Sequence, residues 1–87
     1  MKEIKIVIKQ EHIDKGIPVR PQYCAVALAL DRDPYESWGV CPECIRIGRN
    51  EYIPSLELRR FIRRFDSNLL VEPGTYTARL NTKQRIL

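Results

Sequence analysis

The pattern with the clearest chemical use in this chain is a set of four arginines between positions 59 and 64. On a helix, at about 100° per residue, these side chains fall within an arc of about 140°. Guanidinium groups stay charged and carry a fixed fork of donors, which suits carboxylate and phosphate partners. Two earlier arginines extend this surface if the preceding hairpin packs beside the helix. The predicted partner-binding residues are Arg46, Arg49, Arg59, Arg60, Arg63 and Arg64.

The same arginines also fit a helix face that contacts only solvent. Positive side chains in a last helical turn complement the helix dipole, and Glu57 or Asp66 can pair with them. If the face binds a partner, the sequence favours a protein over a nucleic acid. The net charge is only +4, and the chain lacks a glycine-rich phosphate loop, a helix-turn-helix pattern and aromatic residues that interleave the arginines.

A second pattern, Cys41-Pro42-Glu43-Cys44, has the spacing of a zinc knuckle, in which a tight turn aims two thiolates at one ion. A structural zinc site needs two more ligands, and the remaining candidates are Cys24 and His12. The alternative is a hairpin turn with two free thiols, and with Cys24 packed in the core. A thioredoxin-like redox pair fits less well, because that motif begins a helix and a strand follows here. We favour free thiols and no cofactor, with zinc as the alternative.

No arrangement of catalytic residues stands out. The only histidine, His12, has no serine-centred motif around it. Asp31, Asp33 and Glu36 follow a predicted helix, where interactions with the helix end account for them. We therefore expect a binding protein rather than an enzyme.

The helix that carries the four arginines is the clearest element of the chain. Pro54 and Ser55 precede it, and Ser55 is a natural N-cap. The helix is predicted to end near residues 66–68. Its apolar residues fall within an arc of about 100°, which is typical of a core-facing stripe. These residues are Leu58, Phe61, Ile62 and Phe65.

A second helix is predicted over residues 22–30, where nearly every side chain is apolar. Pro21 suits its first turn, Leu28 is a predicted core residue, and Asp33-Pro34 ends it. A short polar helical turn over residues 10–15 comes before it. We expect Gly16 to end that turn in the left-handed conformation.

Alternating and β-branched residues predict short strands at 3–9, 37–40, 45–47, 51–53 and 75–80. In the first of these, three isoleucines share one face and two lysines the other. The order of elements predicts an α+β fold: a small mixed or mostly antiparallel sheet of three to five short strands, with two main helices on one face. We expect one domain over residues 1–80 and a flexible tail over 81–87.

Composition sets the class of protein. With 44% hydrophobic and 30% charged residues, the 87-residue chain is predicted to fold. The first residues lack a signal-peptide pattern, and the longest apolar run is far shorter than the ~20 residues of a membrane span. Three cysteines cannot all pair within one chain, which favours a reducing compartment. We therefore expect a cytoplasmic protein that does not bind membranes.

Four segments carry a family resemblance. In order along the chain they are residues 10–16 (QEHIDKG), 24–30 (CAVALAL), 61–66 (FIRRFD) and 71–73 (VEP). Together they resemble a group of small uncharacterised proteins encoded by bacteriophages and by bacteria in prophage-like settings. The resemblance implies a phage accessory role and the cytoplasm of the host cell, where small non-enzymatic proteins bind and block or redirect a host factor.

The leading functional hypothesis is therefore an accessory protein that binds a macromolecule, with a host protein preferred, in the manner of a host-defence inhibitor. Two alternatives stay open. One is a small nucleic-acid-binding protein that uses the arginine face of helix 55–66. The other is a zinc-stabilised structural module, and a homodimer is compatible with each of the three.

Overall fold

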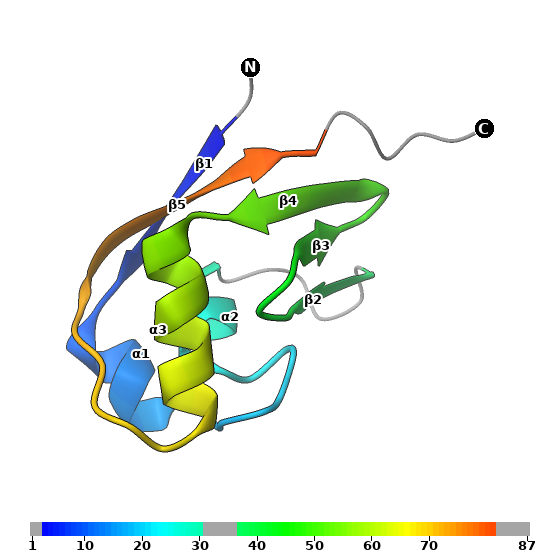
Figure 1. Ribbon diagram of the computed structural model, residues 1–87. Coiled ribbons are helices and arrows are strands. Elements are labelled where there is room, and N and C mark those ends of the chain that lie inside the picture. Colours follow the sequence, from blue (N-terminus) through cyan, green and yellow to red (C-terminus); the bar gives the residue numbers. More distant parts are fainter. Residues whose placement is uncertain (1–2, 31–36, 82–87) are drawn as a thin grey trace.

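The computed structural model describes residues 3–30 and 37–81, and its centre is one antiparallel sheet (Figure 1). The strand order is β1-β5-β4-β3-β2. This architecture confirms the predicted α+β class and the antiparallel pairing. The strands are β1 (Glu3–Ile8), β2 (Trp38–Val40), β3 (Ile45–Ile47), β4 (Asn50–Pro54) and β5 (Gly74–Leu80).

Three helices accompany the sheet: α1 (Gln10–Lys15), α2 (Ala25–Leu30) and α3 (Leu56–Asp66). The helix α2 contacts both edge strands, β1 and β2, whereas α3 contacts the central strands β4 and β5. The sheet therefore curls around these two helices, and α1 packs against α2 (Figure 1).

The core lies between the helices and the inner face of the sheet. In β1, Ile6 and Ile8 are buried while Lys5 and Val7 are exposed, as the alternation predicted. The predicted stripe of α3 is confirmed in full, since all four of its residues are buried: Leu58, Phe61, Ile62 and Phe65.

Local sequence rules fix both ends of α3. The Ser55 hydroxyl oxygen accepts a hydrogen bond from the Leu58 N–H at 3.1 Å, so the predicted N-cap is confirmed. At the other end Asn68 takes the left-handed conformation, with φ of 61°. The Leu69 N–H then donates to the Arg64 carbonyl at 2.8 Å. This is a Schellman ending, and it fixes the direction in which the chain leaves the helix.

The start of α2 differs from the prediction. The helix begins at Ala25 rather than at residue 22, because the Pro21 carbonyl accepts a hydrogen bond from the Val40 N–H at 3.0 Å. This bond holds residue 21 against β2. Leu28, predicted in the core, is only half-buried, whereas Val26 is buried. The predicted stop at residues 33–34 and residues 82–87 of the predicted tail lie outside the described ranges.

Gly16 also differs from the prediction. Its φ of −69° and ψ of 150° are ordinary extended values, so the left-handed conformation was the wrong expectation. The position needs glycine for another reason, which is close approach. A Cβ atom there would lie 2.7 Å from the Ala25 nitrogen, 2.9 Å from the His12 oxygen and 2.9 Å from the Phe65 ring. The absence of a side chain lets α1, α2 and α3 meet.

Gly16→Ala is therefore expected to destabilise the protein. Two of the three crowded atoms belong to the backbone and cannot move away by side-chain rotation. We therefore expect the free energy of unfolding to fall by about 1–3 kcal/mol. Thermal unfolding measures it, at roughly 4–8 °C per kcal/mol for a domain of this size. Gly74→Ala is the matched control, because its nearest neighbour would be the Tyr76 ring at 3.7 Å. Equal melting temperatures for the two variants would contradict the close-packing explanation.

Candidate functional site

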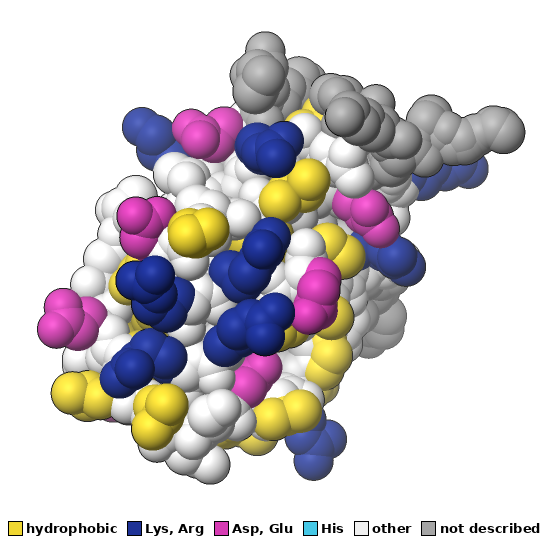
Figure 2. All heavy atoms as spheres, in the orientation of Figure 1, with side chains coloured by type: hydrophobic (Ala, Val, Ile, Leu, Met, Phe, Trp, Pro, Cys, Tyr) yellow, Lys and Arg dark blue, Asp and Glu magenta, His cyan; other side chains and the backbone are white. Residues whose placement is uncertain are grey.

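The solvent side of α3 carries the four predicted arginines together. We call Arg59, Arg60, Arg63 and Arg64 the arginine face. Arg60, Arg63 and Arg64 are exposed, and Arg59 is half-buried. Figure 2 shows Lys and Arg side chains gathered over α3, with hydrophobic side chains around them. The prediction that these four residues share one surface is therefore confirmed.

The arginines are held to different degrees. Arg64 Nε donates a hydrogen bond to the Leu70 carbonyl at 3.0 Å. Arg63 Nη2 lies 3.5 Å from Glu43 Oε2, an ion pair between two exposed side chains. Within the described ranges, Arg60 forms no hydrogen bond or ion pair, and the buried Nε of Arg59 has no acceptor. Arg64 is thus a positioning residue, whereas Arg60 has its full donor capacity available.

Three exposed leucines bracket the arginine face. At 100° per residue Leu56 falls within the arc of the arginines, at the N-terminal end of α3, and it is 66% exposed. Beyond the C-terminal end, Leu69 is 52% exposed and Leu70 is 82% exposed. The Schellman ending and the bond from Arg64 to the Leu70 carbonyl fix this pair in place. Sequence reasoning missed the leucines, since their residue type alone suggests the core.

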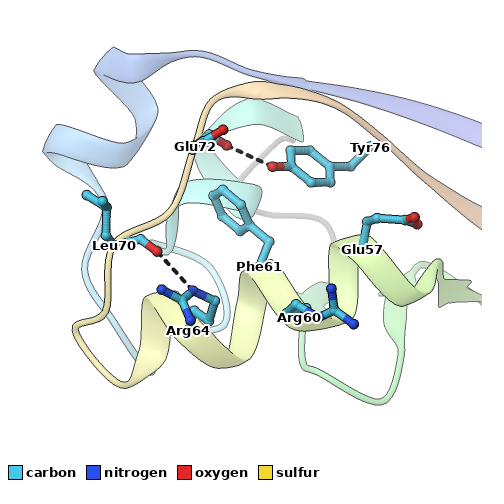
Figure 3. Close-up of a pocket in the computed structure, with 7 residues that line it drawn as sticks. All are labelled: Glu57, Arg60, Phe61, Arg64, Leu70, Glu72 and Tyr76. Atoms are coloured by element: carbon cyan, nitrogen blue, oxygen red, sulfur yellow. Dashed lines mark hydrogen bonds between the residues drawn. The ribbon is translucent and has the colours of Figure 1, made fainter.

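A cavity of about 440 Å³ opens between α3 and the segment 70–76 (Figure 3). Phe61 and Tyr76 form an aromatic wall, with ring centroids 5.1 Å apart, and Leu70 adds an aliphatic side. Burial raises the pKa of Tyr76, and its hydroxyl donates to the Glu72 carbonyl at 2.8 Å. The charged residues that line the cavity are Glu57, Arg60, Arg64 and Glu72.

The two carboxylates expected to pair with the arginines do not do so. Neither Glu57 nor Asp66 forms an ion pair with the arginine face within the described ranges. Asp66 instead accepts a hydrogen bond from the Val19 N–H at 2.9 Å. Val19 has φ of 64°, a conformation that β-branched residues rarely adopt, and it is 69% exposed. Asp66 thus fixes the loop before α2 to the end of α3.

The other two predicted arginines lie elsewhere. Arg46 follows the buried Ile45 on β3, so its side chain is on the outer face of the sheet, where it forms an ion pair with Glu51 at 3.2 Å. Arg49 lies in the turn between β3 and β4. The structure therefore does not bring Arg46 to the arginine face. The part of the hairpin that reaches α3 is Glu43, which the sequence did not single out.

The four predicted metal ligands do not form one group, although Cys24 and Cys41 line the same small cavity. Cys41 is exposed and Cys44 half-buried in the turn between β2 and β3, whereas Cys24 is buried in the core. His12 Nδ1 accepts a hydrogen bond from the Lys9 N–H at 2.9 Å and so helps to cap α1. Among the residues that the structure describes, no three His, Cys, Asp or Glu side chains form a group that could hold a metal ion.

We accordingly expect the purified protein to carry less than one zinc per chain. Elemental analysis of protein expressed in zinc-supplemented medium measures this, with Cys41→Ser and Cys24→Ala as companion variants. One zinc per wild-type chain, lost in both variants, would restore the Cys₃His interpretation.

Compared with known proteins, the chain matches no family model, no curated protein and no solved structure. Within the described ranges, no helix is long and apolar enough to cross a membrane. What the arginine face can bind therefore follows from its geometry and charge.

Proposed function

We propose that this chain is a non-enzymatic accessory protein that binds another protein through the arginine face. One observation carries the proposal: four guanidinium groups on one side of α3 are bracketed by three well-exposed leucines. Exposed apolar side chains gain free energy only when a partner covers them. A charged surface that merely contacts solvent needs no leucines around it.

The composition of this surface is that of a protein interface. Arginine is enriched in such interfaces and lysine depleted, and α3 contains no lysine. Hot spots combine an apolar anchor with charged groups that lose water on binding. The cavity beside Phe61 and Tyr76 provides a place for such an anchor, and Arg60 and Arg64 line it.

The partner surface that fits is acidic and carries a bulky apolar side chain. That side chain would fill the cavity between α3 and the segment 70–76, against aromatic and aliphatic walls. Carboxylates beside it would meet Arg60, which has no partner in the described ranges, and Arg63, whose bond to Glu43 is long. Exchange of an exposed ion pair costs little, because such pairs contribute about 0–1 kcal/mol.

A nucleic acid fits the same surface less well. Glu57 and Glu72 line the cavity together with Arg60 and Arg64, and their carboxylates repel a phosphate backbone. The exposed leucines would lie against phosphate and sugar without an apolar contact. Non-specific single-strand binders instead present aromatic side chains on which bases stack.

The preferred partner is a host protein, and the preferred setting is a bacteriophage or prophage. The resemblance of residues 10–16, 24–30, 61–66 and 71–73 to small phage proteins supports this setting. A binding protein acts most simply by occupying a surface that its target needs. Inhibition of a host-defence factor is one such action.

Affinity capture from bacterial lysate tests the proposal, with and without nuclease. The wild type is compared with Arg60→Glu/Arg63→Glu and with a control of equal charge change, Lys5→Glu/Arg79→Glu. Lys5 and Arg79 are exposed on the outer face of the sheet, away from α3. We expect the wild type and the control to retain one protein that the arginine variant does not retain. Nuclease treatment should not change the amount retained. Retention that nuclease abolishes would favour the nucleic-acid alternative.

A further inference from the structure

The turn between β2 and β3 places two thiols side by side. These strands pair with Val40 opposite Ile45, so the next step of the same register sets Cys41 opposite Cys44. The Cys41 N–H donates to the Cys44 carbonyl at 3.0 Å, which continues the pairing into the turn. Directly opposite residues of an antiparallel pair project to the same face.

This arrangement is compatible with a disulfide. Residues opposite each other in a hydrogen-bonded antiparallel pair have Cα atoms about 5.5 Å apart. Disulfides join cysteines whose Cα atoms are about 4.4–6.8 Å apart, so no large backbone movement is needed. The segment between the thiols is only Pro42-Glu43, and both cysteines are free in the structure.

The two thiols differ in their access to solvent. Cys41 is exposed, and Cys44 is half-buried. Burial raises the pKa of the Cys44 thiol, and the carboxylate of Glu51 raises it further. Cys41 is therefore the thiol that a reagent from solvent meets first, and Cys44 is placed to react second. Cys24 is buried in the core, where burial also raises its pKa.

We propose that Cys41 and Cys44 form a reversible thiol–disulfide exchange site for low-molecular-weight disulfides, and that its oxidation alters the contact between Glu43 and Arg63. Glu43 stands between the two cysteines and lies 3.5 Å from Arg63, so closure of the turn acts on a residue that touches the arginine face. The site itself does not depend on the proposed function.

With oxidised glutathione the chemistry balances in two exchanges. The Cys41 thiolate attacks one sulfur of glutathione disulfide, whose S–S bond breaks, and one glutathione thiolate leaves. Cys44 then loses its proton to solvent and attacks the Cys41 sulfur of the mixed disulfide. The Cys41–Cys44 bond forms and a second glutathione leaves. Two electrons pass from the protein dithiol to glutathione disulfide.

Incubation of the reduced protein with oxidised glutathione, followed by alkylation and peptide mass spectrometry, tests the site. We expect one internal disulfide between Cys41 and Cys44, with Cys24 still alkylated as a thiol. Cys44→Ser should accumulate the mixed disulfide at Cys41, because the second exchange is blocked. A wild-type protein that stops at the mixed disulfide, or that pairs Cys41 with Cys24, would overturn the assignment.

The link to the arginine face has its own measurement. In ¹⁵N-labelled protein, oxidation should shift the Nε–H signal of Arg63, while that of Arg79, on the outer face of the sheet, should stay in place. Glu43→Gln removes the charge that faces Arg63 and should reduce the shift. An internal disulfide that leaves the Arg63 signal unchanged would overturn the coupling between the turn and the helix.

Discussion

Phe61→Ala is expected to lower the free energy of unfolding by about 3–5 kcal/mol, the usual cost of removing a buried phenylalanine. The side chain is 3% exposed and faces the sheet from the middle of α3. Its ring stacks on Phe65 at a centroid distance of 6.2 Å and tilts against Tyr76 at 5.1 Å. Truncation leaves a void next to an existing cavity and removes both aromatic contacts.

A loss of this size is a large part of the stability of a small domain. Urea denaturation followed by circular dichroism measures it as a shift in midpoint. Leu56→Ala is the matched control, because it lies on the same helix but is 66% exposed. That variant should change the midpoint little. Equal midpoints for Phe61→Ala and the wild type would mean that the buried stripe of α3 has been assigned to the wrong residues.

The sequence predicted α3 well because the rules that form it are local. A serine before the helix, apolar residues at helical spacing and an asparagine just after it determine its ends and its buried face. The alternation in β1 is equally local. Each of these features can be judged from a window of fewer than about 20 residues. The structure confirmed the N-cap, the buried stripe, the helix end near residues 66–68 and the alternation in β1, whereas the left-handed Asn68 was not predicted.

The features that the sequence did not predict depend on contacts between distant segments. Gly16 is constrained not only by the His12 oxygen of its own turn but also by the Ala25 nitrogen and by the ring of Phe65, far along the chain. The helix α2 starts late because the Pro21 carbonyl bonds to β2. From their spacing alone, Cys41 and Cys44 could be either metal ligands or free thiols. The choice depends on whether Cys24 and His12 lie beside them, and tertiary packing sets the positions of those two residues.

The exposed leucines at the candidate site also could not be predicted from local sequence. A leucine after a helix suggests a core residue, because most leucines are buried. Leu70 is exposed because the Schellman ending and the bond from Arg64 to its carbonyl direct the chain outward. The arginines were found from the sequence because a charged face is a local pattern. The leucines around them could not be predicted in the same way, because their exposure depends on the path of the loop between α3 and β5.

Charge reversal in Arg60→Glu/Arg63→Glu should weaken binding of the captured partner by at least about 2 kcal/mol, roughly 30-fold in Kd, as for a typical hot spot. Both side chains are exposed, and Arg60 has no partner within the described ranges, so the fold should change little. Calorimetry or fluorescence anisotropy with the purified partner measures the effect. The Lys5→Glu/Arg79→Glu control carries the same change in net charge and should bind like the wild type.

The salt dependence of the same titration separates the two classes of partner. If α3 binds duplex DNA, each neutralised phosphate contributes about −0.9 to the log–log slope of affinity against salt concentration, so four arginines would give a slope of about −3.6. A protein partner held by an apolar anchor as well as by arginines should give a shallower slope. A protein partner should also bind more weakly when Leu70→Ser removes the aliphatic side of the cavity. The affinity for a duplex should not change with that substitution. A steep slope, together with unchanged binding by Leu70→Ser, would mean that the arginine face binds phosphates and would contradict the proposal of a protein partner.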